Sequence, residues 1–158
     1  MSDETTKLQI GQTTVADAEA ILALQKLAYR SEAEIYDDFE IPPLRQTLAE
    51  MQQDFARQLV LKATLDGRIV GSVRAHERAG TCHIGRLIVH PACQNRGIGR
   101  RLMAAIEERF RGVPRYELFT GQRSARNLAF YHKLGYVAFR TEAASERLSI
   151  VYLEKPGS

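Results

Sequence analysis

The chain is poor in cysteine and has no tryptophan: among its 158 residues, only Cys82 and Cys93 carry a thiol. These two cysteines form no Cys-x-x-Cys pair and no cysteine/histidine metal pattern, which argues against a disulfide framework and against a zinc site. We therefore interpret both as incidental thiols and predict that the protein holds no metal.

Long apolar runs are also missing. The longest extend over only a few residues, whereas a transmembrane helix needs roughly 20. Residues 1–6 are polar and acidic, and they lack the basic start and the apolar middle of a secretory signal. These absences predict a cytoplasmic protein that does not associate with membranes.

A strong excess of charge of one sign is absent as well, since 22 basic and 19 acidic residues give a net charge of +3. So small a charge argues against a general nucleic-acid binder unless the charge is concentrated. The charges are in fact sorted into an acidic segment, 30–56, and an arginine-rich segment, 74–111, which suggests two ligands of opposite charge. The arginine-rich segment has no lysine and few aromatic residues that could stack on bases, so we predict no nucleic-acid partner.

The chain does have enough apolar residues for one core. Its 44% apolar and 26% charged residues lie near the average of globular proteins. A chain of this length buries roughly 70% of the surface that its unfolded form exposes. Because no linker, repeat or low-complexity stretch divides it, we predict a single domain over residues 1–158.

The first third of the chain predicts one strand and two helices. Residues 7–10 are a short strand candidate, and Thr14 can cap a helix over residues 15–29. Residues 30–41 show no clear periodicity and predict a loop, with at most one helical turn. Pro43 then opens a second helix with one apolar stripe. The apolar positions of that stripe are Leu44, Leu48, Met51 and Phe55.

The remainder predicts a β-rich unit with two further helices. The turns Asp66-Gly67 and Ala79-Gly80 separate three β-rich runs, which predicts an antiparallel meander. The expected strands cover residues 59–65, 68–77, 81–89, 115–120, 136–141 and 147–154, and the expected helices cover residues 97–110 and 124–134. This order predicts a mixed α+β fold, with parallel pairing where a helix crosses over.

The most informative segment joins a buried strand to the helix over residues 97–110. It reads Gln94-Asn95-Arg96-Gly97-Ile98-Gly99-Arg100-Arg101. The first turn of a helix has unpaired N–H groups, which form an anion site together with the helix dipole and nearby arginines. Glycines let a phosphate come close to the backbone, so the pattern favours pyrophosphate. The competing interpretation is that the glycines merely permit the turn.

Two other phosphate-binding motifs fit this segment less well. A dinucleotide-binding unit needs GxGxxG after a first parallel strand and an acid about 20 residues later, but these glycines follow an antiparallel meander in mid-chain. A P-loop is excluded because no Gly-Lys-Ser/Thr follows.

The sequence resembles the GNAT superfamily of N-acetyltransferases. Residues 94–99 match that family's Q/R-x-x-G-x-G/A acetyl-CoA signature, between a strand ending in Leu-Ile-Val-His-Pro and a helix. Residues 124–136 look like its second motif, in which a helix delivers a tyrosine, here Tyr131, just before x-K-x-G-F/Y. The resemblance covers nearly the whole chain. It implies a mixed, mostly antiparallel sheet of about six to seven strands, flanked by about four helices and splayed in the middle for acyl-CoA.

The resemblance also implies acetyl-CoA as the cofactor. Main-chain groups of residues 87–89 would pair with its pantetheine arm, and the N–H groups of residues 96–101 would hold its pyrophosphate. The expected cofactor-binding residues are Leu87, Ile88, Val89, Gln94, Asn95, Arg96, Gly97, Ile98, Gly99, Arg100, Arg101 and Asn127. Many members carry an asparagine where this chain has Ser124, so Ser124 and Asn127 are alternative cofactor contacts.

Tyr131 is the expected catalytic residue, because the resemblance places it near the thioester sulfur. A phenol with a pKa near 10 is protonated at pH 7 and can give its proton to a thiolate of similar basicity. A main-chain N–H within residues 87–89 is the expected oxyanion donor. The general base stays open between Glu77, His83, His90, the acids of residues 34–38 and water.

Residues 29–43 fall where the family places its substrate-covering loop. Their acids would favour a cationic acceptor, and we expect Glu34, Tyr36 and Asp37 to contact it. The predicted function is an acetyl-CoA-dependent N-acetyltransferase that acts on a primary amine of a small molecule or a protein, with a homodimer left open. The alternative is a non-catalytic acyl-CoA-binding or regulatory module of the same fold.

Overall fold

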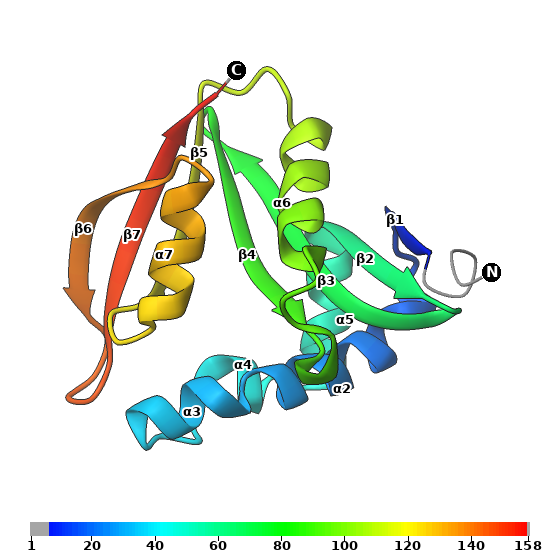
Figure 1. The fold of residues 1–158 in the computed structure, drawn as a ribbon, viewed down its shortest axis with the longest axis horizontal. Helices are drawn as coiled ribbons and strands as arrows, with labels where there is room; N and C mark the ends of the chain where they lie inside the picture. Colours follow the sequence, from blue (N-terminus) through cyan, green and yellow to red (C-terminus); the bar gives the residue numbers. More distant parts are fainter. Residues whose placement is uncertain (1–6, 158) are drawn as a thin grey trace.

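The computed structural model describes residues 7–157 and places seven strands in one sheet (Figure 1). The strands are β1 (Leu8–Gln12), β2 (Leu59–Leu65), β3 (Arg68–Arg78), β4 (Thr81–Val89), β5 (Arg115–Gly121), β6 (Val137–Ala143) and β7 (Ser149–Pro156). They lie in the order β1-β2-β3-β4-β5-β7-β6, and among these described strands only β4 and β5 pair in parallel. The predicted mixed, mostly antiparallel sheet is confirmed.

Helices pack on both faces of the sheet. They are the 3-10 helices η1 (Val15–Asp17) and η2 (Pro91–Cys93) and the α-helices α2 (Ala18–Ala28), α3 (Arg30–Tyr36), α4 (Pro42–Arg45), α5 (Leu48–Arg57), α6 (Ile98–Arg109) and α7 (Ala125–Lys133). Buried residues of α6 and α7 share one apolar core cluster, and those of α2 and α5 form a second. The sheet therefore has an α6/α7 side, which faces the viewer in Figure 1, and an α2/α5 side.

The turns of the β2–β3–β4 meander have the geometry that their residues favour. The φ angles are 52° and 78° at Asp66 and Gly67, and 52° and 82° at Ala79 and Gly80. Positive φ at both central residues matches the twist of the flanking strands and closes a two-residue hairpin. The predicted meander is confirmed.

Strands β4 and β5 begin as neighbours and then diverge. Their parallel pairing covers Thr81–His83 and Arg115–Glu117, and the rest of β5 pairs within the described chain only with β7. Figure 1 shows the two strands separating towards α2 and α3. The splay expected in the middle of the sheet is confirmed.

Residues 30–41 are not the loop that their sequence predicted, because residues 30–36 form α3. This helix follows α2 directly, with Tyr29 between them. It buries Ala33 and Tyr36, and two buried positions in a seven-residue helix are too few to produce a recognisable period. Asp37 ends the helix with a left-handed φ of 51°.

The single helix predicted from Pro43 is also wrong, since the chain forms two helices there. Gln46 and Thr47 are extended between α4 and α5. The Thr47 hydroxyl accepts from the Glu50 N–H, and the Glu50 carboxylate accepts from the Thr47 N–H, so a capping box starts α5. The apolar stripe runs through this box without a change of period, which concealed the break.

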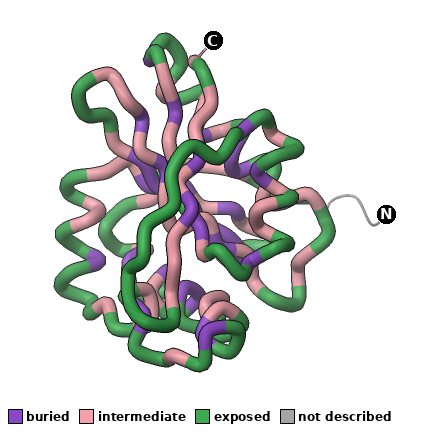
Figure 2. Tube along the Cα trace, turned by 90° about the vertical axis from the view of Figure 1, so that its left-hand side faces the viewer, coloured by how far each residue is buried: buried purple, intermediate pink, exposed green. Residues whose placement is uncertain are grey.

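Strand β6 forms an exposed edge, seen from its own side in Figure 2, and all of its residues are exposed. Within residues 7–157 no helix is both long and apolar enough to cross a membrane. The same residues contain no group of three or more His, Cys, Asp or Glu side chains that could hold a metal.

Candidate active site

The N-terminus of α6 presents amide groups that the helix itself does not use. Its N-cap is Gly97, with φ of 80°, and no side chain in the described chain caps it. The Arg101 N–H donates to the Gly97 carbonyl over 3.1 Å. The N–H groups of Ile98, Gly99 and Arg100 come before this first intrahelical bond, so they are available to a ligand.

The bend at Gly97 is open on the outside and closely packed on the inside. A Cβ at Gly97 would meet only Arg100 Nη2, at 3.9 Å, whereas a Cβ at Gly99 would lie 3.4 Å from the Phe130 ring and 3.8 Å from Val89. Glycine is therefore needed at position 97 for the left-handed backbone conformation, whereas at position 99 it lets α6 pack close to α7 and β4.

Arginines surround this bend. Arg96, Arg100 and Arg101 are exposed beside it. From α7, Arg126 Nη2 donates to Asn95 Oδ1 over 3.2 Å and holds the loop. Guanidinium groups next to unpaired amides at a helix N-terminus favour a polyphosphate.

Strand β4 has one unpaired edge in its C-terminal half. Ile88 and Val89 pair with β3, but pairing with β5 ends at His83 among the described residues. Main-chain groups of residues 87–89 that face β5 can therefore pair with an extended ligand arm as if it were an added strand.

A β-bulge lies where β4 turns away from β5. The register shifts between Ser72 and Arg74 of β3, so that Arg86 and Leu87 together face one β3 residue. Arg86 has φ of 51°, a left-handed conformation that is uncommon outside glycine. The extra residue bends the strand and redirects its side chains.

Tyr131 lies on α7 with its ring packed edge-on against Phe130 and Tyr136, at centroid distances of 5.2 Å and 6.1 Å. Within residues 7–157 its hydroxyl forms no hydrogen bond. Burial raises the pKa of this phenol well above its usual value, and Tyr29 and Glu32 add to the increase. The phenol therefore keeps its proton at neutral pH.

Helix α3 connects the two diverging halves of the molecule. The Tyr36 hydroxyl accepts from the Arg123 N–H over 2.6 Å. A Cβ at Gly121 would overlap the Tyr36 phenol, so the glycine on β5 makes room for this ring. Tyr36, one of the residues expected to contact the acceptor, is thus buried at the junction of α3, β5 and α7.

Glu32 makes the second contact between α3 and α7. Its Oε2 accepts hydrogen bonds from the Ser124 hydroxyl and, over 3.4 Å, from Asn127 Nδ2. Asn127 Nδ2 also donates to Thr120 Oγ1 over 3.3 Å. Both alternative cofactor contacts, Ser124 and Asn127, therefore lie beside a carboxylate that sequence reasoning had not selected.

The other two residues expected to contact the acceptor lie at the surface. Glu34 and Asp37 are exposed. The Asp37 carbonyl accepts from Arg147 Nη1 over 2.5 Å, and its carboxylate lies 3.8 Å from the same atom. These acids give the outer surface of α3 a negative charge.

The candidate bases differ in their surroundings. His83 stacks on His76 with ring centroids 5.2 Å apart, and its Nδ1 lies 3.9 Å from Glu117. Burial lowers the pKa of His83, although Glu117 opposes this, so the imidazole is neutral at pH 7. His90 Nδ1 already accepts a main-chain N–H in η2, and Glu77 is exposed.

Tyr29, Glu32 and Arg86 are site residues that the sequence did not single out. Burial raises the pKa of Tyr29. The charges of Arg86 and Arg74 oppose this increase and the charge of Glu32 adds to it, so these groups are electrostatic neighbours. If residues 30–36 are taken as a helix, Glu32 lies four residues before Tyr36 on the same helix face. This spacing would have indicated Glu32 as a candidate site residue beside Tyr36.

Two surface hollows lie elsewhere. One of about 180 Å³ is bounded by β1, η1 and α5, and one of about 300 Å³ lies between α7, β6 and β7. The first has no titratable side chain in its lining and the second has only His132. Neither offers groups for acid–base chemistry comparable with those between β4 and β5.

Comparisons with known proteins agree with this geometry. The model of the acetyltransferase (GNAT) family matches residues 19–136. Among curated proteins, the UPF0157 protein YqkA of Bacillus subtilis (strain 168) is 27% identical over 141 residues, which are 89% of this chain and 40% of that protein. The chain thus spans less than half of the length of this relative.

Solved structures with the same fold include several N-acetyltransferases. The ribosomal-protein-S18-alanine N-acetyltransferase of Escherichia coli has a TM-score of 0.76 at 18% identity, covering 96% of this chain and 94% of that one. The PaiA N-acetyltransferase of Thermoplasma acidophilum, in complex with coenzyme A, has a TM-score of 0.70 at 18% identity, covering 95% and 99%. The ribosomal-protein-alanine N-acetyltransferase of Brucella melitensis has a TM-score of 0.73 at 22% identity, covering 94% and 99%. At such identities the likeness concerns the fold.

Proposed function

The chain belongs to the acetyltransferase (GNAT) family, and we propose that it transfers the acetyl group of acetyl-CoA to a primary amine of a small molecule or a protein. The observation that carries this proposal is the juxtaposition of an open helix N-terminus, an unpaired edge of β4 and the Tyr131 phenol around one divergence of the sheet.

The residues at the start of α6 suit the pyrophosphate of the cofactor. Three amides without intrahelical partners follow Gly97, which has room for a ligand on its outer side. We assign the pyrophosphate to the N–H groups of residues 97–100 with the side chains of Arg96, Arg100 and Arg101 around them, and the pantetheine arm to the open edge of residues 87–89. The Arg101 N–H, which was expected to take part, is already used within the helix. Gln94 and Asn95 shape the loop beside this site, and Asn127 contributes from α7.

Acetyl-CoA supplies an activated acetyl group and a thiolate leaving group. A main-chain N–H of residues 87–89 donates to the carbonyl oxygen, on which negative charge develops. The Tyr131 hydroxyl donates its proton to the departing sulfur. Its raised pKa means that the phenol carries this proton at neutral pH.

The acceptor side of the site favours a cation, and we propose that the amine arrives as its ammonium form. Glu34 and Asp37 attract a cation to the surface of α3. Glu32 Oε2 is engaged by Ser124 and Asn127, which leaves Oε1 to accept from the ammonium group. His83, neutral at pH 7, is our candidate for removal of the ammonium proton, directly or through water.

The test is to incubate the full chain with acetyl-CoA and a panel of primary amines and to follow free thiol and acetylated product. We expect amine-dependent thiol release. Binding of CoA without acetylation of any amine would instead favour the non-catalytic acyl-CoA-binding module, and the absence of CoA binding would contradict both functions.

Three further expectations accompany this proposal. We place the reaction in the cytoplasm, treat residues 1–158 as one acetyltransferase domain, and leave a homodimer open. Fractionation, limited proteolysis and light scattering test these points in turn.

A further inference from the structure

Arg86 differs from every other arginine in residues 7–157. Three arginines there are not exposed: Arg74, Arg86 and Arg115. Arg74 lies 3.2 Å from the Asp54 carboxylate, and Arg115 lies within 2.8 Å of two carboxylates. Arg86 has no ion pair and no side-chain hydrogen bond recorded with any described residue, so its charge has no counterion there.

One end of this guanidinium is fully buried. Arg86 Nη1 is one of two buried side-chain polar atoms in the described chain that have no hydrogen-bond partner. Leaving a buried charged donor unpaired is costly, and such groups occur where a ligand or an ordered water completes them. Its backbone is also in the left-handed region, with φ of 51°, so the bulge aims this side chain at a conformational cost.

Arg86 belongs to the acceptor side of the divergence. Arg86 directly follows Gly85, which pairs with Arg74 of β3, and its charge acts on Arg74 and on Tyr29. Arg74 contacts Met51 of α5 through Nη1, at 3.2 Å from the sulfur. These neighbours lie on the α2/α5 side of the sheet, opposite the helix whose N-terminus we assign to the pyrophosphate. A phosphate held at α6 is therefore not the missing partner of Arg86.

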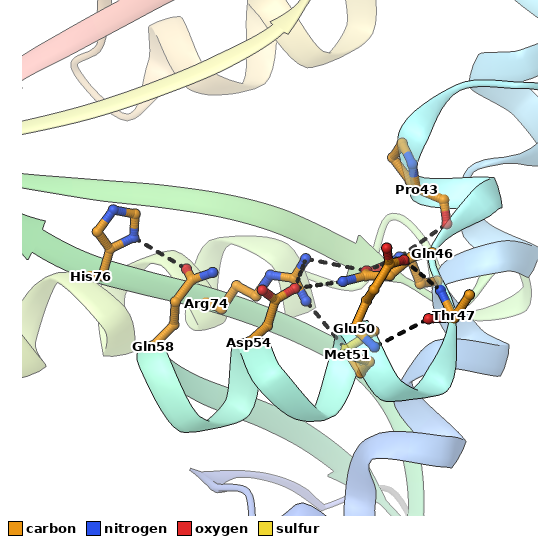
Figure 3. A network of polar contacts seen from close by, with 10 residues as sticks. Pro43, Gln46, Thr47, Glu50, Met51, Asp54, Gln58, Arg74 and His76 are labelled. Carbon is orange, nitrogen blue, oxygen red and sulfur yellow. Dashed lines mark hydrogen bonds and ion pairs between the residues drawn. The ribbon is translucent and has the colours of Figure 1, made fainter.

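Arg74, which lies on the same side of the sheet, already has partners for its guanidinium group. Figure 3 shows Arg74 within a network that includes Asp54 and Gln46. The Gln46 Oε1 atom accepts a hydrogen bond from Arg74 Nη2 over 3.4 Å and a second one from Gln25 Nε2 over 2.9 Å. The second unpaired buried atom of the described chain is Oε1 of that same Gln25. Gln25 precedes Tyr29 by one turn of α2, so the two unpaired groups, an acceptor and a charged donor, belong to one region.

We propose that Arg86 binds an oxyanion of the acceptor, so that the substrate is an amine that also carries a carboxylate, as an amino acid does. This inference rests on the proposed function. The ammonium group then lies towards Glu32 and Tyr131, and the carboxylate pairs with the Arg86 guanidinium. In the reaction the amine nitrogen forms a bond to the acetyl carbon as the carbon–sulfur bond breaks. The base takes one proton from the ammonium group before the attack, Tyr131 protonates the thiolate, and the second nitrogen proton returns to the Tyr131 phenolate through water, while the carboxylate is unchanged.

The experiment compares acceptors that differ only in this group. The full chain is assayed with acetyl-CoA and α-amino acids of small, aliphatic, aromatic and acidic side chains, each beside its amide and its decarboxylated amine. We expect kcat/KM for the preferred amino acid to exceed that of its amide by about tenfold or more. In Arg86→Gln we expect the ratio of the two kcat/KM values to fall to near one, and in Arg86→Lys we expect part of the preference to remain. The control is Arg68→Gln, which changes an exposed arginine of β3 and should leave the ratio unchanged.

A binding measurement separates this inference from the proposed function. With CoA present, N-acetyl amino acids and their amides are titrated into wild type, Arg86→Gln and Arg68→Gln by calorimetry. We expect the acid to bind about tenfold or more tightly than the amide in wild type and in Arg68→Gln only. This result supports the Arg86 site even if no amine in the panel is acetylated.

Equal binding of acids and amides by wild type, or an undiminished preference in Arg86→Gln, overturns the inference while leaving acetyl transfer intact. If Arg86→Gln does not fold, Arg86→Lys decides the matter, because a carboxylate preference equal to that of wild type in this variant contradicts bidentate binding by a guanidinium.

Discussion

Gly97 combines two properties that no other amino acid offers at the start of α6. Its φ is 80°, and a Cβ there would project into space bounded only by Arg100 Nη2 at 3.9 Å. A side chain at this position would both strain the backbone and occupy the place that we assign to the pyrophosphate.

Substitution Gly97→Glu tests this assignment. We expect CoA binding to weaken by about a hundredfold or more, because a carboxylate is placed beside the phosphates in a partly desolvated site. Calorimetry measures the affinity. The control is Gly112→Glu, which introduces the same charge at a glycine with φ of 104° and no neighbour within 4 Å, at the opposite end of α6. CoA affinity of Gly97→Glu equal to that of Gly112→Glu would refute the placement.

Tyr131 and Tyr136 form a matched pair for separating chemistry from stability. Tyr131 has no recorded partner for its hydroxyl in the described chain, whereas the Tyr136 hydroxyl donates to Glu107 Oε2 over 2.7 Å. Removal of each hydroxyl therefore has a different expected consequence.

We expect Tyr131→Phe to lower kcat by about a hundredfold while CoA affinity stays unchanged, because the proton donor to the thiolate is lost. We expect Tyr136→Phe to lower the free energy of unfolding by about 1–3 kcal/mol without a comparable loss of kcat, because a buried hydrogen bond is lost. Steady-state kinetics and denaturant titration measure the two effects. Unchanged kcat in Tyr131→Phe would exclude the proposed role of its phenol.

At the level of elements, α3 is held by contacts with residues far along the chain. Tyr36 packs on Gly121 and accepts from the Arg123 N–H, and Glu32 accepts from Ser124 and Asn127. The helix therefore depends on the turn between β5 and α7 rather than on its own propensity, since isolated helices of this length are unstable in water.

Substitution Gly121→Ala tests how α3 is held. A methyl group at Gly121 would overlap the Tyr36 phenol, so we expect a loss of about 1–3 kcal/mol in the free energy of unfolding and faster amide exchange in α3. Gly11→Ala is the control, because a Cβ there meets nothing within 4 Å. Equal exchange rates in α3 of the two variants would show that Tyr36 does not hold the helix.

The whole molecule contains several acidic groups whose pKa values burial raises. They include Tyr29, Tyr116, Tyr131 and Tyr136, and also Cys82, whose thiol has a pKa of about 12. A raised pKa means that the folded state keeps a proton that the unfolded chain releases. The stability that these groups provide is therefore complete below pH of about 9 and is lost as the pH rises further.

We expect the free energy of unfolding to fall from pH of about 9 upward, and to fall less steeply in Cys82→Ala and in Tyr136→Phe. Each substitution should reduce the slope by up to about 1.4 kcal/mol per pH unit within its own window, from about pH 9 for the thiol and from about pH 10 for the phenol. Arg74, whose pKa burial lowers to about 10, acts in the opposite direction but is common to all three proteins. Parallel slopes would contradict the raised pKa values.

Contiguous motifs account for what could be predicted before the structure. The turns at residues 66–67 and 79–80, the strand-to-helix turn at residues 94–101 and the position of Tyr131 each depend on neighbouring residues, because turn chemistry and helix termini are local. Family resemblance supplied the splay of the sheet, which no local pattern encodes. Helix α3 and the break before α5 were missed, because a short helix shows no period and a capping box was hidden inside an apolar stripe.

The sequence by itself determined the meander, the order of the strands and the turn that opens α6, since these follow from residues adjacent along the chain. Only the tertiary structure brought Glu32 to Ser124 and Asn127, across 92 and 95 positions, and buried Arg86 Nη1 without a hydrogen-bond partner among the described residues. The physical reason is that burial and the pairing of charges depend on which distant segments pack together. The acceptor side that we propose therefore depends on the folded chain, whereas the cofactor side that we propose was predicted from the sequence.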